Sequence, residues 1–183
     1  ALILDCDNTL WKGILGEEGF DKIAMSTKTK DGVIFSEIQS IALNLNKQGI
    51  LICLCSKNNL KDVNEVIMSH PDMQLRDNHI SINKSNWLDK VTNLKAISNE
   101  LNVGLDSLVF VDDSSFEVNL IRNQLPEVTV LQVPENISEY PKLIRENMGL
   151  FFNLSITAED EKKNEIYKHQ LKRDGARKKY SNV

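Results

Sequence analysis

Two carboxylate side chains stand two residues apart near the start of the chain, at Asp5 and Asp7, directly after the apolar run 1–4. Such a run is typical of a buried strand, and residues two apart on a strand share a face. Carboxylates that face the same way repel each other unless a cation or a proton lies between them. Mg²⁺ suits such a pair, because it prefers oxygen ligands and is usually held by one or two carboxylates together with a substrate phosphate. The alternative is the start of a helix, with Asp7 or Asn8 as its N-cap.

Two further apolar runs, 49–55 and 107–111, also end in short polar or charged side chains. The residues that follow them are, in chain order, Ser56, Lys57, Asn58, Asp112 and Asp113. Because the ligands of an open α/β sheet collect beyond the carboxyl ends of its strands, we expect the three strand ends to form one site. Lys90 stands at the head of a stretch whose apolar residues recur at helical spacing. Lys84 is a second candidate for a cation at this site, but it lies in a less regular stretch.

Expected strands and helices alternate along the chain, which favours an α/β fold with a Rossmann-like parallel sheet and helices on both faces. The expected strands are 1–4, 50–55, 79–82, 107–111 and 128–133. The expected helices are 36–47, 59–69, 89–102, 115–124 and 141–147. We expect Ser36 to cap the first of these helices and Gly49 to end it. The glycine-rich stretch 12–33 predicts a small hairpin or flap beside the site, and the spacing of the elements leaves no room for a large cap.

Four short motifs, in this order, resemble those of the haloacid dehalogenase superfamily: Asp5-x-Asp7-x-Thr9, Ser56, Lys90 and Asp112-Asp113. The residues around them resemble the FkbH-like branch of that superfamily, in the segments 4–19, 55–58, 86–90 and 110–117. The resemblance implies a haloacid-dehalogenase-like catalytic core over residues 1–150. It is followed by a charged, helical extension over 151–183, which we expect to lead to a missing domain.

The resemblance implies a role for each matched residue. Asp5 matches the nucleophile, whose attack on phosphorus gives an aspartyl-phosphate, and Asp7 matches the general acid and base. Lys90 is expected to neutralise the charge that builds up on the transferring group. The residues expected to contact the substrate are Thr9, Ser56, Lys57 and Asn58. The residues expected to hold Mg²⁺ are Asp5, Asp7 (also through its backbone carbonyl), Asp112 and Asp113, with Asp113 favoured over Asp112 as the direct or water-bridged ligand.

Members of the FkbH-like branch resemble phosphatases but serve polyketide pathways. The resemblance therefore implies an Mg²⁺-dependent enzyme that uses a phosphorylated three-carbon acyl donor similar to 1,3-bisphosphoglycerate. Such an enzyme loads the glyceryl unit onto an acyl carrier protein and releases phosphate. One alternative is a phosphomonoester or phosphoprotein phosphatase with an open active site. Another is a non-catalytic binding module on the same scaffold.

Composition limits the partners and the location. The chain has 183 residues, of which 26% are charged, and its net charge of −4 gives no sign of wholesale nucleic-acid binding. No apolar run approaches the roughly 18–20 residues of a membrane span, and no basic segment opens a signal peptide. The three cysteines, Cys6, Cys53 and Cys55, fall in expected buried strands and fit the reduced thiols of a cytoplasmic protein. A chain that starts directly on a strand is also expected to be a fragment of a longer polypeptide.

Several residues allow a simpler structural interpretation. Ser56 is either a phosphate contact or the cap of the helix 59–69. We expect Trp11 to anchor the core or the flap rather than to stack on a ligand, and Cys6 to point into the core rather than to carry an acyl thioester. The basic residues of an expected helix over 158–180 form either a solvated face or a docking surface for an acidic partner such as a carrier protein.

Overall fold

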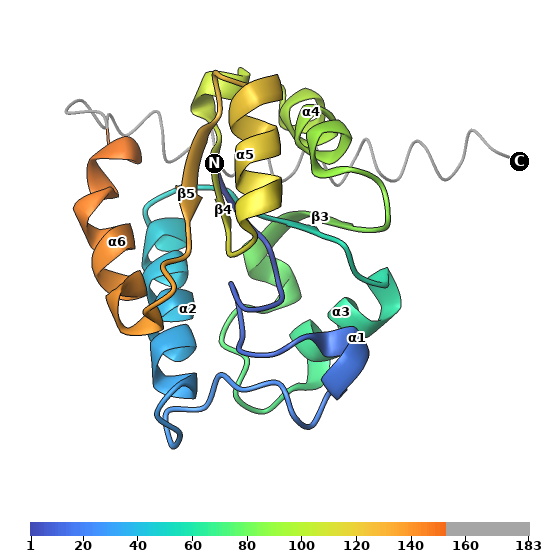
Figure 1. The fold of residues 1–183 in the computed structure, drawn as a ribbon, viewed down its shortest axis with the longest axis vertical. Coiled ribbons are helices and arrows are strands. Elements are labelled where there is room, and N and C mark those ends of the chain that lie inside the picture. Colours follow the sequence, from blue (N-terminus) through green and yellow to red (C-terminus); the bar gives the residue numbers. More distant parts are fainter. Residues whose placement is uncertain (153–183) are drawn as a thin grey trace, which may run out of the picture.

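The computed structural model describes residues 1–152, and its centre is a sheet of five parallel strands (Figure 1). The strands are β1 Leu2–Leu4, β2 Ile52–Ser56, β3 Ile80–Ser85, β4 Val109–Asp112 and β5 Thr129–Gln132. They lie in the order β3-β2-β1-β4-β5, and every neighbouring pair is parallel. The α/β fold predicted from the alternating runs is confirmed. The main difference is that β3 continues to Ser85, beyond its expected end at residue 82.

Helices connect the strands, as parallel pairing requires. Within the described residues they are α1 Leu15–Glu18, α2 Gly32–Lys47, α3 Leu60–Ser69, α4 Lys90–Leu101, α5 Ser115–Gln124 and α6 Tyr140–Glu146. The chain leaves α2 at Gly49, as predicted, and the φ of +95° at this residue explains the choice of glycine.

The start of α2 differs from the prediction, because the helix begins at Gly32 and not at Ser36. Ser36 is therefore not the N-cap, and its carbonyl and hydroxyl oxygens instead accept hydrogen bonds from Nε2 of Gln74. The amide of Gly32 donates to Oγ1 of Thr29 at 3.1 Å. A Cβ atom at Gly32 would lie 2.5 Å from the carbonyl oxygen of Ser26. The close approach of the preceding turn thus explains both the glycine and the earlier helix start.

Each face of the sheet has its own core. Leu2 and Leu4 pack on the side of α2, α3 and α6, whereas Ile3 between them packs on the side of α4 and α5. Alternate strand residues point to opposite faces, so the continuous apolar runs of the sequence are what a sheet covered on both sides needs. Figure 1 shows α2 and α6 together on one side, and α4 beside α5 on the other. Each fully buried aliphatic side chain adds about 1.5–3 kcal/mol to the stability that holds the strand ends in place.

The strand order reverses between β1 and β4, which lie side by side. From β1 the sheet continues outward through β2 to β3, and from β4 it continues in the opposite direction to β5. Ligands of open α/β sheets bind in the crevice beyond the carboxyl ends of the strands at such a reversal. The topology therefore singles out the residues that follow β1 and β4.

The segment after β1 forms the expected small flap. Lys12 and Ala24 exchange two backbone hydrogen bonds of 2.9 Å, and α1 lies between them. Gly13 opens the flap with a φ of +101°, and its amide donates to Oδ1 of Asn8 at 3.0 Å. Residues 57–89 form α3, a short 3₁₀ turn and β3, so the described part of the chain contains no large cap.

The predicted extension 151–183 lies outside the described residues except for residues 151 and 152, and so does its expected helix 158–180. The domain boundary stays a prediction. No helix among the described residues is long and apolar enough to cross a membrane. The three cysteines are buried free thiols, as expected.

Candidate active site

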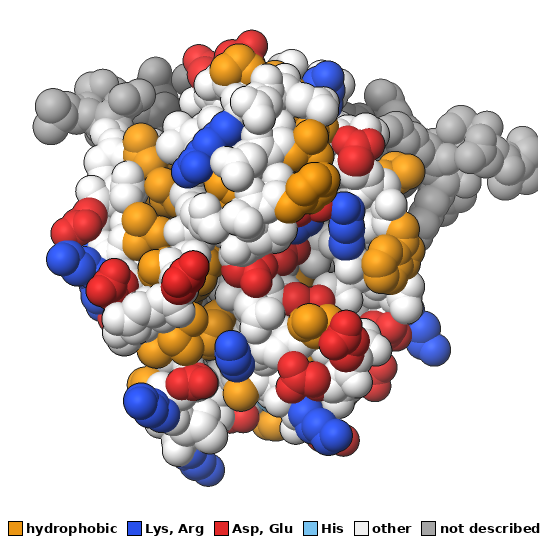
Figure 2. Space-filling model, viewed as in Figure 1, with side chains coloured by type: hydrophobic (Ala, Val, Ile, Leu, Met, Phe, Trp, Pro, Cys, Tyr) orange, Lys and Arg blue, Asp and Glu red, His pale blue; other side chains and the backbone are white. Residues whose placement is uncertain are grey.

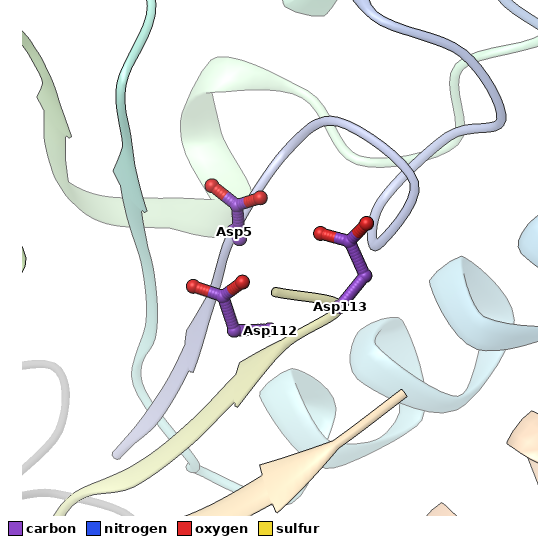
Figure 3. Close-up of side chains that lie close together, drawn as sticks. All are labelled: Asp5, Asp112 and Asp113. Carbon is purple, nitrogen blue, oxygen red and sulfur yellow. The ribbon is translucent and has the colours of Figure 1, made fainter. Parts of the chain in front are cut away.

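Three carboxylates meet beyond the ends of β1 and β4. Asp5 follows β1, and its amide extends the strand pairing by donating to the carbonyl of Val111 at 3.0 Å. Asp112 is the last residue of β4, and Asp113 is the next residue. One oxygen from each of the three carboxylates lies within 4.8 Å of the others, and Figure 3 shows the three groups on the same side of the strand ends. Oxygen ligands at this spacing fit a hard divalent cation such as Mg²⁺.

Lys90 places a cation beside these carboxylates. It is the first residue of α4, whose N-cap Asp89 accepts a hydrogen bond from the amide of Thr92 at 2.7 Å. The Nζ atom of Lys90 lies 2.5 Å from Oδ2 of Asp112 and 3.0 Å from Oδ1 of Asp5. Lys90 is only 4% exposed, and an ammonium group so buried is tolerated only when it is paired. The ion pairs therefore tie the start of α4 to both strand ends.

The crowding of these charges changes their pKa values. Burial and the nearby charge of Asp5 raise the pKa of Asp112 to about 7, against the opposing effect of Lys90. The same two causes, in the same order, raise the pKa of Asp113. Burial alone would lower the pKa of Lys90, but the charges of Asp5 and Asp112 outweigh it and raise that pKa. Mutually repelling carboxylates of this kind favour a bound cation.

Asp7 is held in one orientation by three donors. Its Oδ1 accepts hydrogen bonds from Nε1 of Trp11 and from the amide of Leu15, both at 3.0 Å. Its Oδ2 accepts from Nδ2 of Asn58, also at 3.0 Å. Because β1 already ends at Leu4, strand alternation does not bring the Asp7 carboxylate into the close group of three, and it turns toward the flap. Burial raises the pKa of Asp7, and the three hydrogen bonds oppose this rise.

Ser56 and Asn58 lie buried at the end of β2. The amide group of Asn58 donates to Oγ of Ser56 at 3.1 Å in addition to its bond to Asp7. The helix α3 begins at Leu60 with Asn59 in the N-cap position. Ser56 therefore does not cap this helix, and a contact with substrate stays the prediction for it.

Lys57 forms an ion pair with Glu117, a residue that the sequence interpretation did not place in the site. Its Nζ lies 2.5 Å from Oε1 of Glu117, and the two side chains are 43% and 7% exposed. The other oxygen, Oε2, is buried and has no hydrogen-bond partner among the described residues. Ser114 and Glu117 have the spacing of a capping box, and Oγ of Ser114 does accept from the amide of Glu117 at 3.4 Å. That signal predicts a helix start, but it does not predict a side chain that reaches Lys57.

Thr9 is fully buried, and α6 helps to hold it. Its carbonyl oxygen accepts a hydrogen bond from the hydroxyl of Tyr140 at 3.2 Å. The Oγ1 atom of Thr9 has no partner within the described part of the chain. Tyr140 was not expected near the site, because no local pattern signals a contact between residues so far apart in the sequence.

The simpler interpretations of Trp11 and Cys6 agree with the structure, and Lys84, the second candidate for the site cation, pairs elsewhere. Trp11 is fully buried, as a core and flap anchor should be. Cys6 is fully buried as well, and burial raises the pKa of its thiol well above the ordinary value, so it does not have the character of a reactive cysteine. Lys84 pairs with Glu100 at 2.5 Å, whereas Lys90 faces the carboxylate cluster.

Comparison with known proteins gives a likeness among solved structures. No family model and no curated protein matches the chain. A solved structure does match: the crystal structure of the N-terminal part of the protein BF1531 from Bacteroides fragilis, containing a phosphatase domain and complexed with Mg. The TM-score is 0.81 and the sequence identity 37%, and the match covers 85% of this chain but 41% of that one. The likeness agrees with the phosphatase-like fold expected from the motifs, and it does not bear on the FkbH-like branch.

Proposed function

We propose that this protein is an Mg²⁺-dependent phosphoryl-transfer enzyme of the haloacid dehalogenase type. The placement of Asp5 carries the proposal, because its carboxylate lies 3.0 Å from Nζ of Lys90 and belongs to the close group with Asp112 and Asp113. A carboxylate beside a lysine and a cation site can attack phosphorus, since both positive charges draw negative charge from the phosphoryl oxygens. The similar phosphatase domain that was complexed with Mg supports the same cofactor for this chain.

In the first step of this mechanism, Asp5 attacks the phosphorus atom of the bound substrate. A bond forms between a carboxylate oxygen and phosphorus, the bond to the leaving group breaks, and the leaving oxygen takes a proton from Asp7. The raised pKa of Asp7, caused mainly by burial, suits a group that must hold this proton. Lys90 neutralises charge on the transferring oxygens. Asp5, Asp112 and Asp113 would hold Mg²⁺, which would supply further charge neutralisation when bound.

In the second step, the oxygen of a water molecule attacks phosphorus while Asp7 takes a proton from that water. The bond between Asp5 and phosphorus then breaks, phosphate leaves, and both carboxylates return to their starting states. Asp7 needs the same orientation in both steps, and the hydrogen bonds from Trp11, Leu15 and Asn58 provide it.

The substrate contacts that we propose lie on the same edge of the sheet. The hydroxyl of Ser56 and the amide of Asn58, already joined at 3.1 Å, are placed to bind phosphoryl oxygens. The side chain of Lys57 is 43% exposed beside this site, and its charge can attract an anionic substrate. The unpartnered hydroxyl of Thr9 is a further donor in the same loop as the nucleophile.

The finer form of the proposal follows the FkbH-like resemblance of the sequence. The donor is then a phosphorylated three-carbon acyl compound similar to 1,3-bisphosphoglycerate. The thiol of an acyl carrier protein attacks the carbonyl carbon of this donor, the bond from that carbon to the phosphate oxygen breaks, and phosphate leaves while the thiol proton passes to water. Asp5 then removes the second phosphate from the carrier-bound acyl group by the two steps above, which leaves a glyceryl thioester and free phosphate. The alternative is a phosphomonoester or phosphoprotein phosphatase. The described residues contain no large cap over the site, which supports a bulky substrate in either case. We place the enzyme in the cytoplasm, acting on neither nucleic acid nor membrane.

One assay separates these forms. The protein is incubated with Mg²⁺, 1,3-bisphosphoglycerate and a carrier protein; mass spectrometry detects acylated carrier, and a colorimetric assay detects free phosphate. Acylated carrier supports the finer form, whereas phosphate release without it, together with turnover of simple phosphate esters, supports the alternative.

Asp5→Asn tests the shared mechanism, because it replaces one carboxylate oxygen at constant size. It should lower turnover roughly 10⁴-fold or more while leaving the fold intact. The matched control Asp21→Asn, at an exposed aspartate outside the site, should retain activity. EDTA should remove turnover and Mg²⁺ should restore it. Turnover that survives either Asp5→Asn or EDTA contradicts the proposal.

A further inference from the structure

Large apolar side chains are exposed around the acidic cluster. At least one stands in the segment that follows each of the strands β1 to β4, on the carboxyl edge of the sheet. We call this set the apolar rim, and it consists of Ile14, Leu60, Trp87, Leu88 and Phe116. Exposed apolar groups scattered singly need no explanation, but a set gathered around a reactive centre indicates a binding surface.

Trp87 is fixed in position although it is 70% exposed. Its Nε1 donates to Oδ1 of Asn59 at 3.0 Å. The residue before Asn59 along the chain is Asn58, which binds Ser56 and Asp7. Because the one polar atom of the indole already has a protein partner, the ring offers a ligand only its apolar faces. This hydrogen bond therefore holds the indole ring beside the loop that carries the proposed phosphate contacts.

Phe116, which is 68% exposed, lies at the start of α5, shortly after the metal-site aspartates. Its neighbour Glu117 pairs with Lys57 at 2.5 Å. Lys57 is also two residues before Asn59, the hydrogen-bond partner of Trp87. The Lys57–Glu117 ion pair thus links the segment that holds Trp87 to the segment that carries Phe116. Figure 2 shows this kind of pattern, with apolar side chains on both sides of a basic one and next to a group of acidic ones.

Two lysines of this edge are already paired, which shapes what the rim can bind. Lys57 and Lys90 each face a carboxylate at 2.5 Å. A second anionic group on the substrate would have to compete with those carboxylates. An apolar or planar group would instead cover the rings of Trp87 and Phe116 without displacing any existing partner.

We propose that Trp87 and Phe116 form a subsite for an apolar, preferably planar, part of the phosphorylated substrate. The phosphoryl group reaches Asp5, while the far part of the same molecule packs against the indole and the phenyl ring. This inference rests on the phosphomonoester phosphatase form of the function proposed above, because the glyceryl donor of the other form carries no apolar group. It identifies the substrate class as phosphate compounds that carry an apolar group a short distance from the reacting phosphorus.

The test compares benzyl phosphate with methyl phosphate, whose leaving groups are both alcohols. The measured quantity is the ratio of kcat/KM for the two esters. Trp87→Ala should lower this ratio about 10-fold or more, as expected from the loss of one aromatic stacking partner. Phe116→Ala should lower it in the same direction, and Trp87→Phe should keep most of it because a ring remains. Met68→Ala, at a 72% exposed apolar residue outside the rim, is the matched control and should leave the ratio unchanged.

A binding measurement separates failure of the subsite from failure of the proposed function. Benzylphosphonate and methylphosphonate have a P–C bond in place of the ester P–O bond, so the enzyme cannot hydrolyse them. Each is titrated into the protein in the presence of Mg²⁺ while tryptophan fluorescence is recorded. Trp11 is fully buried and Trp87 exposed, so a response that is present in the wild type and lost in Trp87→Phe reports the rim. Tighter binding of benzylphosphonate with this response, but no turnover of either ester, supports the subsite and overturns the phosphatase form of the proposed function. Turnover with an equal ratio in all variants and no such response overturns the subsite and assigns the rim to contact with another protein.

Discussion

Lys90→Met tests whether a buried cation holds the two strand ends of the site together. Methionine keeps a flexible unbranched side chain of similar length but removes the charge. In the wild type, Nζ lies 3.0 Å from Asp5 and 2.5 Å from Asp112. In the variant these carboxylates stay buried next to Asp113 without their counter-charge.

The size of the effect follows from the burial of these groups. Removing one partner of a buried ion pair costs about 3–5 kcal/mol, because the charge left behind is uncompensated. Lys90 serves two carboxylates, so we expect the upper part of this range in metal-free protein at pH 8. For a domain of this size, that corresponds to a fall in Tm of roughly 10–20 °C. The loss should shrink at lower pH, since the pKa of Asp112 is already raised to about 7 and protonation removes its charge.

The free energy of unfolding is measured by urea denaturation, followed by circular dichroism, in EDTA and in Mg²⁺. Mg²⁺ should reduce the loss, because it neutralises the same carboxylates. The control is Lys84→Met, which breaks the partly exposed pair with Glu100 and should cost no more than about 1 kcal/mol. If Lys90→Met costs no more than this control in EDTA at pH 8, the buried cation does not hold the site together and the reasoning is wrong.

Three other predictions follow from the same geometry. Mg²⁺ affinity should weaken as pH falls through 7, because Asp112 must release a proton to bind metal. Burial and the charge of Asp5 raise the pKa of Asp112 to about 7. Titration calorimetry at several pH values measures the affinity, and an affinity that does not change with pH contradicts the prediction. Without metal, the free energy of unfolding should fall as pH rises from about 4 toward 7, since Asp112 keeps a proton in the native state that it releases in the unfolded state. Urea denaturation at several pH values in this range measures the change, and a free energy of unfolding that rises with pH refutes the prediction. Trp11→Phe removes the 3.0 Å hydrogen bond to Asp7 and should cost about 1–3 kcal/mol of unfolding free energy and lower kcat; a variant as stable and active as the wild type argues against a positioned Asp7.

The thiols give a further check on the packing of the sheet. Burial raises the pKa of Cys53 to about 12 and raises the pKa of the other two cysteines as well. Iodoacetamide at pH 8 should therefore label no cysteine of the native protein and all three in urea. Rapid labelling of the native protein would show that the sheet is less closely packed than described.

Much of the fold was predictable because its signals are local. The apolar runs that precede Asp5, Ser56 and Asp112 mark buried parallel strands, and all of these strands end on one edge of the sheet. The side chains able to do chemistry could therefore be assigned to a single edge from the pattern of apolar runs alone. The helix start at Gly32 was missed, because it depends on how closely the preceding turn packs.

The sequence by itself determined the order of strands and helices and the types of side chain available at the site, since both depend on neighbouring residues. Only the tertiary structure decided which side chains meet. Lys57 pairs with Glu117 of α5, Tyr140 donates a hydrogen bond to the carbonyl of Thr9, and Trp87 donates one to Asn59 in the loop after β2. Such contacts join segments that are distant along the chain, and their geometry depends on the packing of helices on the sheet, which no local pattern specifies.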